Sequence, residues 1–208
     1  MNNLNELLKN VSIMGLLQNQ KISENIINNI RFPLRDYQEE TLKRFIYYNE
    51  DTLNPAIQQI KKIPTHLLFN LATGAGKTLL MACLILYYYE KGYRNFLFFV
   101  NQKNLVSKTI DNLCNSTSSK YLFKQSTLIN GRKVRVKQVT SFNEMSDDIQ
   151  IQFSTIQGLQ KSIEEPRENT NTLENLTKQK VVMISDECHH LNASTKKLNK
   201  SELEDEKS

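Results

Sequence analysis

One short segment combines two glycines, a lysine and a hydroxyl side chain in the order that suits phosphate binding. It reads Leu71-Ala72-Thr73-Gly74-Ala75-Gly76-Lys77-Thr78. Glycines let backbone N–H groups curl around a phosphate, and a helix that starts there adds a favourable dipole. We expect Lys77 to contact the β- and γ-phosphates of a nucleotide and the Thr78 hydroxyl to ligate Mg²⁺. The segment therefore predicts a phosphate loop in which residues 73–78 bind the nucleotide, although Leu71 takes a first position that usually holds glycine.

Two adjacent carboxylates follow an apolar segment later in the chain. Asp186 and Glu187 come directly after 181–185, and Asp186 is 109 residues beyond Lys77 (186 minus 77). A carboxylate at a strand end can hold Mg²⁺ directly or through water, and a second one beside it can deprotonate an attacking water. We expect Asp186 at the metal, and Glu187 as general base acting with Lys77 in catalysis. The pair alone is weak evidence, but its order after the phosphate loop strengthens it.

The cysteines and the paired histidines do not suggest a structural metal site. Cys83, Cys114 and Cys188 are widely spaced and form no C-x-x-C pair. This spacing argues against a disulfide framework or a zinc ribbon and suits a reducing compartment. Cys188, His189 and His190 are consecutive and cannot all turn to one ion.

The elements that must position these groups alternate between strand and helix. Strands are expected at 66–71, 95–100, 132–139, 149–155 and 181–185, and helices at 35–48, 78–90 and 103–113. Apolar strands bounded by helices predict an α/β fold, a mainly parallel sheet with helices on both faces. A short helical turn is expected at 159–163 and a polar surface loop at 164–180. The sheet is expected to be incomplete on its C-terminal side.

Composition agrees with one folded domain. The chain has 208 residues, of which 39% are hydrophobic and 24% charged, so a packed core is expected and wholesale disorder is not. The net charge of +5 permits a polyanion partner without proving one. The N-terminus does not show the basic segment followed by an apolar segment that is typical of a signal peptide. The longest apolar run is shorter than the roughly 20 residues that cross a bilayer. We expect a cytoplasmic protein.

Further segments carry a family resemblance. With the phosphate loop and 186–189, the segment Leu34-Arg35-Asp36-Tyr37-Gln38 resembles the Q motif of superfamily 2 helicases and translocases with a DEAD/DEAH-type box. Residues 98–103 stand where motif Ia falls, and 153–159 resemble the T-x-Q segment that follows it. Within the superfamily, 89–101 and 185–193 resemble the Res subunit of type III restriction enzymes.

The resemblance implies a RecA-like P-loop NTPase lobe that uses ATP and Mg²⁺. It also implies double-stranded DNA and a Mod methyltransferase subunit as partners. By position, Gln38 would read the adenine edge with Arg35 nearby. Thr155 and Gln157 would lie on the nucleic-acid face, and His189 would couple that face to the ATP site. Residues 32–197 would form the lobe, after a helical extension at 1–31 and before a charged, disordered tail at 198–208.

The expected function is the ATP-binding front half of a DNA-dependent ATPase motor. Only 18 mostly polar residues follow His190 (208 minus 190), so we expect the second lobe and the nuclease domain to be absent. An arginine finger from a second lobe is worth about 10³ to 10⁵ in rate. The isolated chain is therefore expected to hydrolyse ATP very slowly. The alternative is a catalytically inactive nucleotide-binding or partner-docking fragment.

Other nucleotide-binding classes fit the residues less well. A GTPase would want N-K-x-D, but 199–202 ends in glutamate and lies in the polar tail. A small-molecule kinase would want a lid with several arginines, and 164–180 holds only Arg167. The basic side chains of Lys133, Arg135 and Lys137 could touch DNA phosphates. A solvated face of an edge strand, guarded against aggregation by lysine, explains them at least as well.

Overall fold

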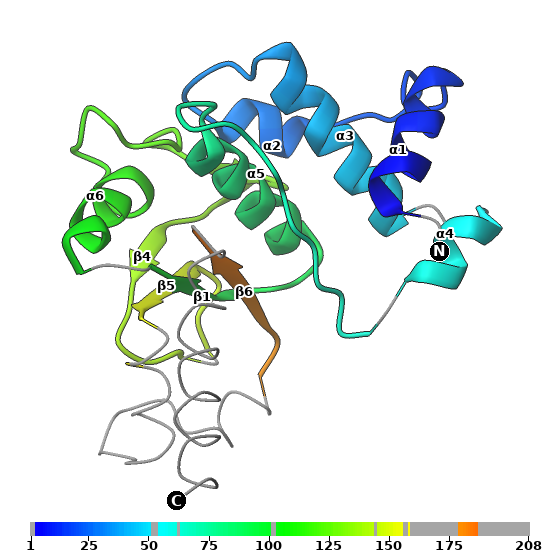
Figure 1. The fold of residues 1–208 in the computed structure, drawn as a ribbon. Helices are drawn as coiled ribbons and strands as arrows, with labels where there is room; N and C mark the ends of the chain where they lie inside the picture. Colours follow the sequence, from blue (N-terminus) through cyan, green and yellow to red (C-terminus); the bar gives the residue numbers. More distant parts are fainter. Residues whose placement is uncertain are drawn as a thin grey trace, which may run out of the picture.

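A computed structural model of the chain describes residues 3–50, 54–61, 63–100, 103–143, 145–155, 158 and 179–186. Its helices are α1 (Leu4–Ile13), α2 (Glu24–Asn29), α3 (Asp36–Glu50), α4 (Pro55–Ile60), α5 (Lys77–Glu90) and α6 (Lys103–Leu113). Its strands are β1 (Asn95–Phe99), β2 (Leu128–Ile129), β3 (Arg132–Lys133), β4 (Val136–Gln138), β5 (Ile149–Ser154) and β6 (Val181–Ser185). Figure 1 shows their arrangement.

Four parallel strands form the central sheet, in the order β4-β5-β1-β6. β1 pairs along its whole length on both sides, with Phe96 opposite Ile151 of β5 and Val182 of β6. All five residues of β1 are buried, as expected for a strand that is covered on both faces. Parallel strands end at one edge of the sheet, which is where open α/β sheets bind ligands. The predicted α/β fold with a mainly parallel sheet is confirmed.

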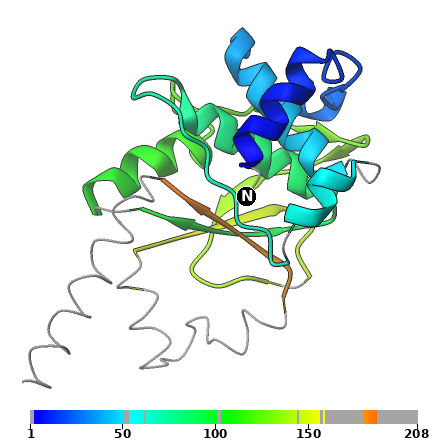
Figure 2. The same ribbon diagram turned by 45° about the vertical axis from the view of Figure 1, so that its right-hand side comes forward.

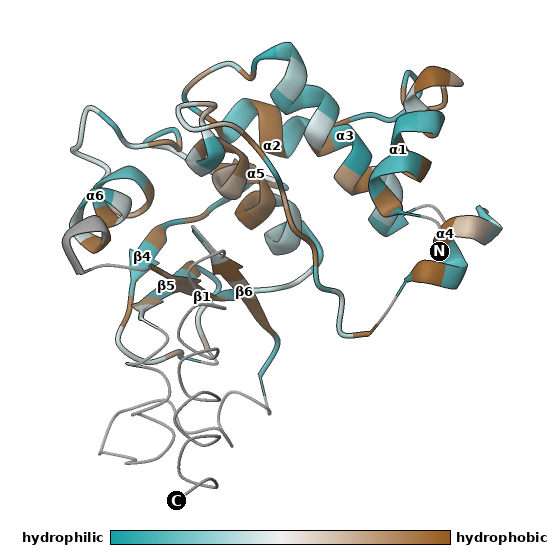
Figure 3. Ribbon diagram, in the orientation of Figure 1, coloured by the Kyte–Doolittle hydropathy of each residue, from teal (hydrophilic) through white to brown (hydrophobic). Residues whose placement is uncertain are grey.

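Helix α5 lies over this sheet and starts directly after the phosphate loop (Figure 1). Nine of its 14 residues are buried, and Figure 3 shows its apolar surface among the other helices. A helix with apolar side chains on nearly all of its faces is buried, because other elements pack against those faces. The position of Lys77, the first residue of α5, is therefore fixed by the core.

The strand expected at 66–71 is not formed, which corrects the sequence-based prediction. The segment runs as a coil (Figure 2), while Leu67, Phe69 and Leu71 pack partly buried against the core and Leu68 is 75% exposed. The alternation of buried and exposed side chains is therefore real. A strand, however, also needs a neighbour with which to exchange backbone hydrogen bonds. None of the described strands pairs with this segment.

The strand expected at 132–139 is divided between two sheets, which is a second correction. β3 pairs antiparallel with β2, and β4 pairs parallel with β5 at the sheet edge. Between them, the Val134 N–H donates to Thr127 O, and the Arg135 N–H donates to the Asp148 carboxylate. These two hydrogen bonds hold the segment in which the chain leaves the β2–β3 sheet and enters the central sheet. The predicted faces are right, because the valines are buried and the basic side chains are exposed.

Before α3 the chain forms the two helices α1 and α2, separated by a non-helical segment, and α2 packs into the same core. Ile26 is fully buried and Ile30 is 5% exposed. The Asn29 side chain donates to Leu128 O at 2.7 Å and accepts from the Leu128 N–H at 2.8 Å. One amide thus satisfies both backbone groups of a residue in β2, and α2 and the β2–β3 hairpin hold each other in place.

Cys83 and Cys114 are free, and burial raises the pKa of both thiols to about 12. Both thiols therefore stay protonated at neutral pH. In the ranges given above, no helix is long and apolar enough to cross a membrane. The turn expected at 159–163, most of the loop expected at 164–180 and the tail at 198–208 lie outside the described residues.

Candidate functional site

The phosphate loop makes a tight turn that requires its two glycines. The backbone has positive φ at Gly74 (+78°) and at Gly76 (+72°). Residues with a Cβ atom enter this left-handed region at a cost of about 1–2 kcal/mol. The Ala75 N–H closes the turn by donating to Ala72 O at 3.1 Å. Gly76 O then accepts from the Leu79 N–H at 3.0 Å, so the turn leads straight into the first turn of α5.

The start of α5 offers backbone donors and one cation. The first N–H groups of a helix have no carbonyl partner inside the helix. In α5, the first carbonyl oxygen to accept a helical hydrogen bond is that of Gly76. The N–H groups of Gly76, Lys77 and Thr78 come before this bond and have no carbonyl partner inside the helix. The Lys77 ammonium reaches back to Leu71 O at 3.4 Å, which places its charge near the loop. Three donors and a cation at a helix N-terminus suit an anion such as a phosphate.

The segment before α3 is hydrogen-bonded to the loop. The Gln38 side-chain amide donates from Nε2 to Ala75 O at 2.9 Å and to Gly76 O at 3.3 Å. The Tyr37 hydroxyl donates to Ala75 O at 2.8 Å. Arg35 is linked to both side chains, because its N–H donates to Gln38 Oε1 and its guanidinium donates to the Tyr37 oxygen. The structure thus brings the predicted residues Arg35 and Gln38 together with the loop, and it adds Tyr37, which the sequence had not singled out.

The Gln38 amide is already used inside the protein. Gln38 is 3% exposed, both N–H groups of Nε2 point at loop carbonyls, and Oε1 accepts from Arg35. An adenine edge presents both an acceptor and a donor, so Gln38 could read it only by exchanging some of these bonds. The adenine contact of Gln38 and Arg35 stays a prediction.

Asp186 lies where the carboxyl ends of the strands meet. It follows β6 directly, and its N–H donates to Phe99 O at the end of β1. Its Oδ1 atom is buried and has no hydrogen-bond partner among the described residues. Buried polar atoms are nearly always satisfied, so this oxygen fits a bound cation or a water held by one. Asp186 is therefore a suitable ligand for a cation, although no hydrogen bond or ion pair between described residues joins it to the phosphate loop, and the Mg²⁺ contact of the Thr78 hydroxyl stays a prediction.

The remaining predicted site residues are only partly described. Thr155 follows β5 at the same sheet edge, and its hydroxyl accepts from the Gly158 N–H at 3.0 Å. Gln157, Glu187 and His189 lie outside the described residues. Within the described part of the chain, no cluster of three or more His, Cys, Asp or Glu side chains could hold a metal by itself. A cation here would need ligands from the nucleotide or from water, as is usual for Mg²⁺.

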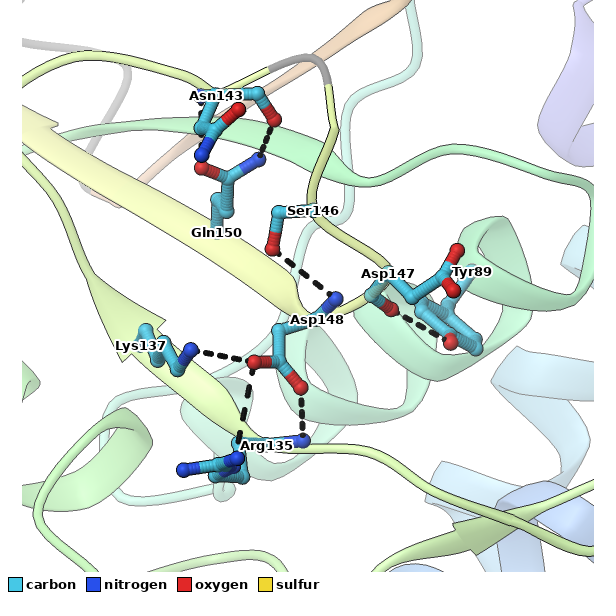
Figure 4. Close-up of polar contacts among 8 residues, drawn as sticks. All are labelled: Tyr89, Arg135, Lys137, Asn143, Ser146, Asp147, Asp148 and Gln150. Atoms are coloured by element: carbon cyan, nitrogen blue, oxygen red, sulfur yellow. Dashed lines mark hydrogen bonds and ion pairs between the residues drawn. The ribbon is translucent and has the colours of Figure 1, made fainter.

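The basic segment at 133–137 is partly neutralised by Asp148 (Figure 4). The Asp148 carboxylate lies 2.5 Å from Lys137 Nζ and 4.0 Å from Arg135 Nε. Burial alone would raise the pKa of Asp148, but the hydrogen bonds from Lys137 and from the Arg135 N–H outweigh it and lower that pKa below 3.8. Two of the three basic side chains therefore have an intramolecular partner, which favours the edge-strand interpretation of this segment over DNA contact.

An open hollow of about 520 Å³ lies on the surface at the other end of α5. It is lined by Tyr87, Tyr88 and Lys91, with Glu50 and Tyr93 among its other walls. A helix of 14 residues is about 20 Å long, so this hollow is well separated from the phosphate loop at the first residue of α5. It takes no part in the arrangement described above.

Comparisons with known proteins agree with these features. Residues 31–205 match the family model described as type III restriction enzyme, res subunit. A curated relative from Haemophilus influenzae, a probable type III restriction-modification enzyme HindVIP Res subunit, is 44% identical over 186 residues. The match covers 89% of this chain and 36% of the relative, so the chain spans about a third of that protein's length. No solved structure matches the chain significantly.

Proposed function

The chain belongs to the family of type III restriction enzyme Res subunits, and from this premise we propose that it binds ATP with Mg²⁺ as part of a DNA-dependent ATPase motor. The observation that carries the proposal is the phosphate loop. Two glycines have positive φ in this loop, and the N–H groups of Gly76, Lys77 and Thr78 have no hydrogen-bond acceptor among the described residues. These groups and the Lys77 ammonium lie at the start of α5, which is packed into the core. Residues 32–197 would form its RecA-like lobe.

Each residue of the proposed site has a separate task. The N–H groups of Gly76, Lys77 and Thr78 bind phosphate oxygens, and the Lys77 ammonium leaves Leu71 O to neutralise the β- and γ-phosphates. Thr78 and Asp186 hold Mg²⁺, which when bound supplies further positive charge to the phosphate oxygens. Glu187 is the proposed general base that accepts a proton from the attacking water. Gln38 and Arg35 are proposed to contact adenine once the bonds of Gln38 have rearranged.

The proposed partners follow from the family. The relative from Haemophilus influenzae is named as a subunit of a restriction-modification enzyme. We infer double-stranded DNA as the polymer that stimulates turnover and a Mod methyltransferase subunit as the protein partner. Thr155, Gln157 and His189 are proposed to connect the nucleotide to the DNA-binding face. The proposal places the protein in the cytoplasm, where ATP and DNA are both available.

A second candidate is a protein that binds nucleotide, or docks on a partner, without turnover. One observation favours it: the segment at 66–71 that leads into the loop has no strand partner among the described residues. A phosphate loop that is held by α5, Tyr37 and Gln38 but is not preceded by a paired strand would bind phosphates but position them less rigidly for attack.

The test is ATP turnover by the purified chain, with and without duplex DNA, beside Lys77→Ala. Lys91→Ala is the matched control, because it removes the same charge at the far end of α5, where Lys91 pairs with Glu50 at 2.6 Å. DNA-stimulated turnover that is lost in Lys77→Ala and kept in Lys91→Ala supports the motor. Lys77-dependent binding without turnover supports the second candidate. Binding that is equal in all three proteins would overturn both.

A further inference from the structure

The carbonyl oxygen of Ala75 accepts two side-chain hydrogen bonds from one neighbouring segment. Tyr37 Oη donates to it at 2.8 Å and Gln38 Nε2 at 2.9 Å. A carbonyl oxygen has two lone pairs, so these two bonds use its capacity. The peptide that joins Ala75 to Gly76 is therefore held from its oxygen side.

This contact also sets the direction of the Gly76 N–H. In a planar trans peptide the C=O and the next N–H point in opposite directions. Because the Ala75 carbonyl points to Tyr37 and Gln38, the Gly76 N–H points away from them. No bond between described residues uses this N–H as donor. It is thus one of the groups that are free for a phosphate oxygen.

The proton of the Tyr37 hydroxyl has one evident acceptor. Arg35 Nη1 donates to the Tyr37 oxygen at 3.1 Å, and a guanidinium can only donate. The single phenolic proton is therefore left for Ala75 O. Arg35 and Tyr37 thus form a short chain of hydrogen bonds that ends on the loop.

We propose that Tyr37 is a positioning residue that orients the Ala75–Gly76 peptide, so that the Gly76 N–H is directed at the bound phosphates before they arrive. The proposal deepens the proposed function and rests on it. Tyr37 acts through the loop backbone and does not itself touch the base or the phosphates. Its removal should therefore weaken phosphate binding without changing the choice of base.

The first test observes this peptide directly in the nucleotide-free chain. Gly76 is the only glycine that follows an alanine in the sequence. Labelling alanine at the carbonyl carbon and glycine at nitrogen therefore gives one carbonyl–amide cross-peak in an NMR spectrum, that of Ala75–Gly76. Tyr37→Phe should shift this cross-peak, because a hydroxyl bond to the Ala75 oxygen is lost.

A matched control removes an equivalent bond elsewhere. Tyr89 Oη donates to Asp147 O at 2.8 Å, a tyrosine-to-carbonyl bond of the same length towards the other end of α5 (Figure 4). Tyr89→Phe should leave the Ala75–Gly76 cross-peak in place. The thermal midpoint of each variant, measured in the same samples, separates a local effect from a loss of fold.

The second test measures binding of ATP, GTP and inorganic tripolyphosphate. Loss of one hydrogen bond corresponds to about a 3- to 10-fold change in affinity. Tyr37→Phe should lower the affinities for ATP and for tripolyphosphate by the same factor in that range, and it should leave the ratio of the ATP and GTP affinities unchanged. Tyr89→Phe should not lower the affinities for ATP and tripolyphosphate in this way. Lys77→Ala, which should weaken binding of all three ligands by at least about tenfold, reports on the proposed function separately.

Several results would overturn the inference. One is an unmoved cross-peak in Tyr37→Phe. Another is an ATP affinity that falls while tripolyphosphate affinity does not, which would place Tyr37 at the base. A preformed loop must also bind a phosphate chain that carries no nucleoside. The inference would therefore be overturned if the protein bound ATP through Lys77 but did not bind tripolyphosphate. If Lys77→Ala binds normally, the proposed function fails, whereas the cross-peak still decides whether Tyr37 orients the peptide.

Discussion

A Cβ atom on Gly76 would lie 2.5 Å from Gln38 Nε2, a distance that real Cβ contacts essentially never show. The Gln38 amide reaches the backbone of the loop only because residue 76 has no side chain. The glycine therefore has two roles, since it also permits the φ of +72°. Gly74 has a similar φ of +78°, but apart from its chain neighbours no heavy atom of the described residues lies within 4 Å of a Cβ placed on it.

This difference predicts unequal costs for two alanine substitutions. Gly74→Ala and Gly76→Ala should both lower the free energy of unfolding by about 1–2 kcal/mol through backbone strain. Gly76→Ala should cost about 1–3 kcal/mol more, because Gln38 must give up its buried bonds. Denaturant unfolding without nucleotide measures both. In a Gln38→Ala background the excess should disappear, and an excess that persists there would show that Gln38 is not its cause.

The Asp186 carboxylate should support the binding of Mg²⁺ but lower the free energy of unfolding of the nucleotide-free chain. Its Oδ1 is buried and has no hydrogen-bond partner among the described residues, and a carboxylate oxygen costs more to leave without a partner than a neutral amide oxygen. Asp186→Asn should therefore raise the free energy of unfolding of the nucleotide-free chain, by about 1 kcal/mol. The same variant should lose the effect of Mg²⁺ on ATP affinity. Titrations with and without Mg²⁺ test this, with the exposed Asp111→Asn as control, and unchanged Mg²⁺ dependence would contradict it.

The packing of α2 predicts that residues far before the phosphate loop matter for stability. Ile26 is fully buried, whereas its neighbour Ile27 is 47% exposed. Ile26→Ala should lower the free energy of unfolding by about 2–5 kcal/mol, as is typical of a large-to-small change in a core. Ile27→Ala should cost clearly less. Equal losses in chemical denaturation would mean that α2 does not contribute its buried face to the core.

Asp148 predicts a dependence of stability on pH. Its pKa is lowered from 3.8 in the folded chain, so its stabilising contribution is present above 3.8 and is lost as the pH falls through the folded pKa. The stability difference between the chain and Asp148→Asn should be about 1 kcal/mol near pH 6, since Lys137 is half exposed and screened. It should shrink below about pH 4. The exposed Asp147→Asn is the neighbouring control, and a difference that grows on acidification would reverse the assignment.

Sequence periodicity predicted the elements that local pattern controls. β1, α6 and β6 lie where apolar runs or helical spacing placed them. The strand expected at 66–71 has the right alternation, but alternation does not supply a pairing neighbour. The break at Val134 and Arg135 could not be seen either, because the alternation continues unchanged across it. It depends on acceptors at Thr127 and Asp148, which are distant in the sequence.

The sequence predicted candidate site residues but not their contacts. Order and spacing singled out the glycines, Lys77 and Asp186, whose roles stay predictions. They gave no sign of the bond between Tyr37 and Ala75, which joins residues 38 apart through one hydroxyl and one backbone carbonyl. Contacts of this kind depend on how α3 and α5 pack, and a backbone acceptor leaves no trace in the sequence.

The central claim is that the loop before α5 binds the phosphates of ATP. The most direct measurement is a calorimetric titration of ATP and Mg²⁺ into the full chain, Lys77→Ala and Lys91→Ala. The account predicts that Lys77→Ala weakens binding by at least about tenfold, because a charged hydrogen bond to phosphate is worth about 1.5–3 kcal/mol, while Lys91→Ala binds like the unmodified chain. Equal affinity in all three proteins, or no ATP binding by any of them, would contradict it.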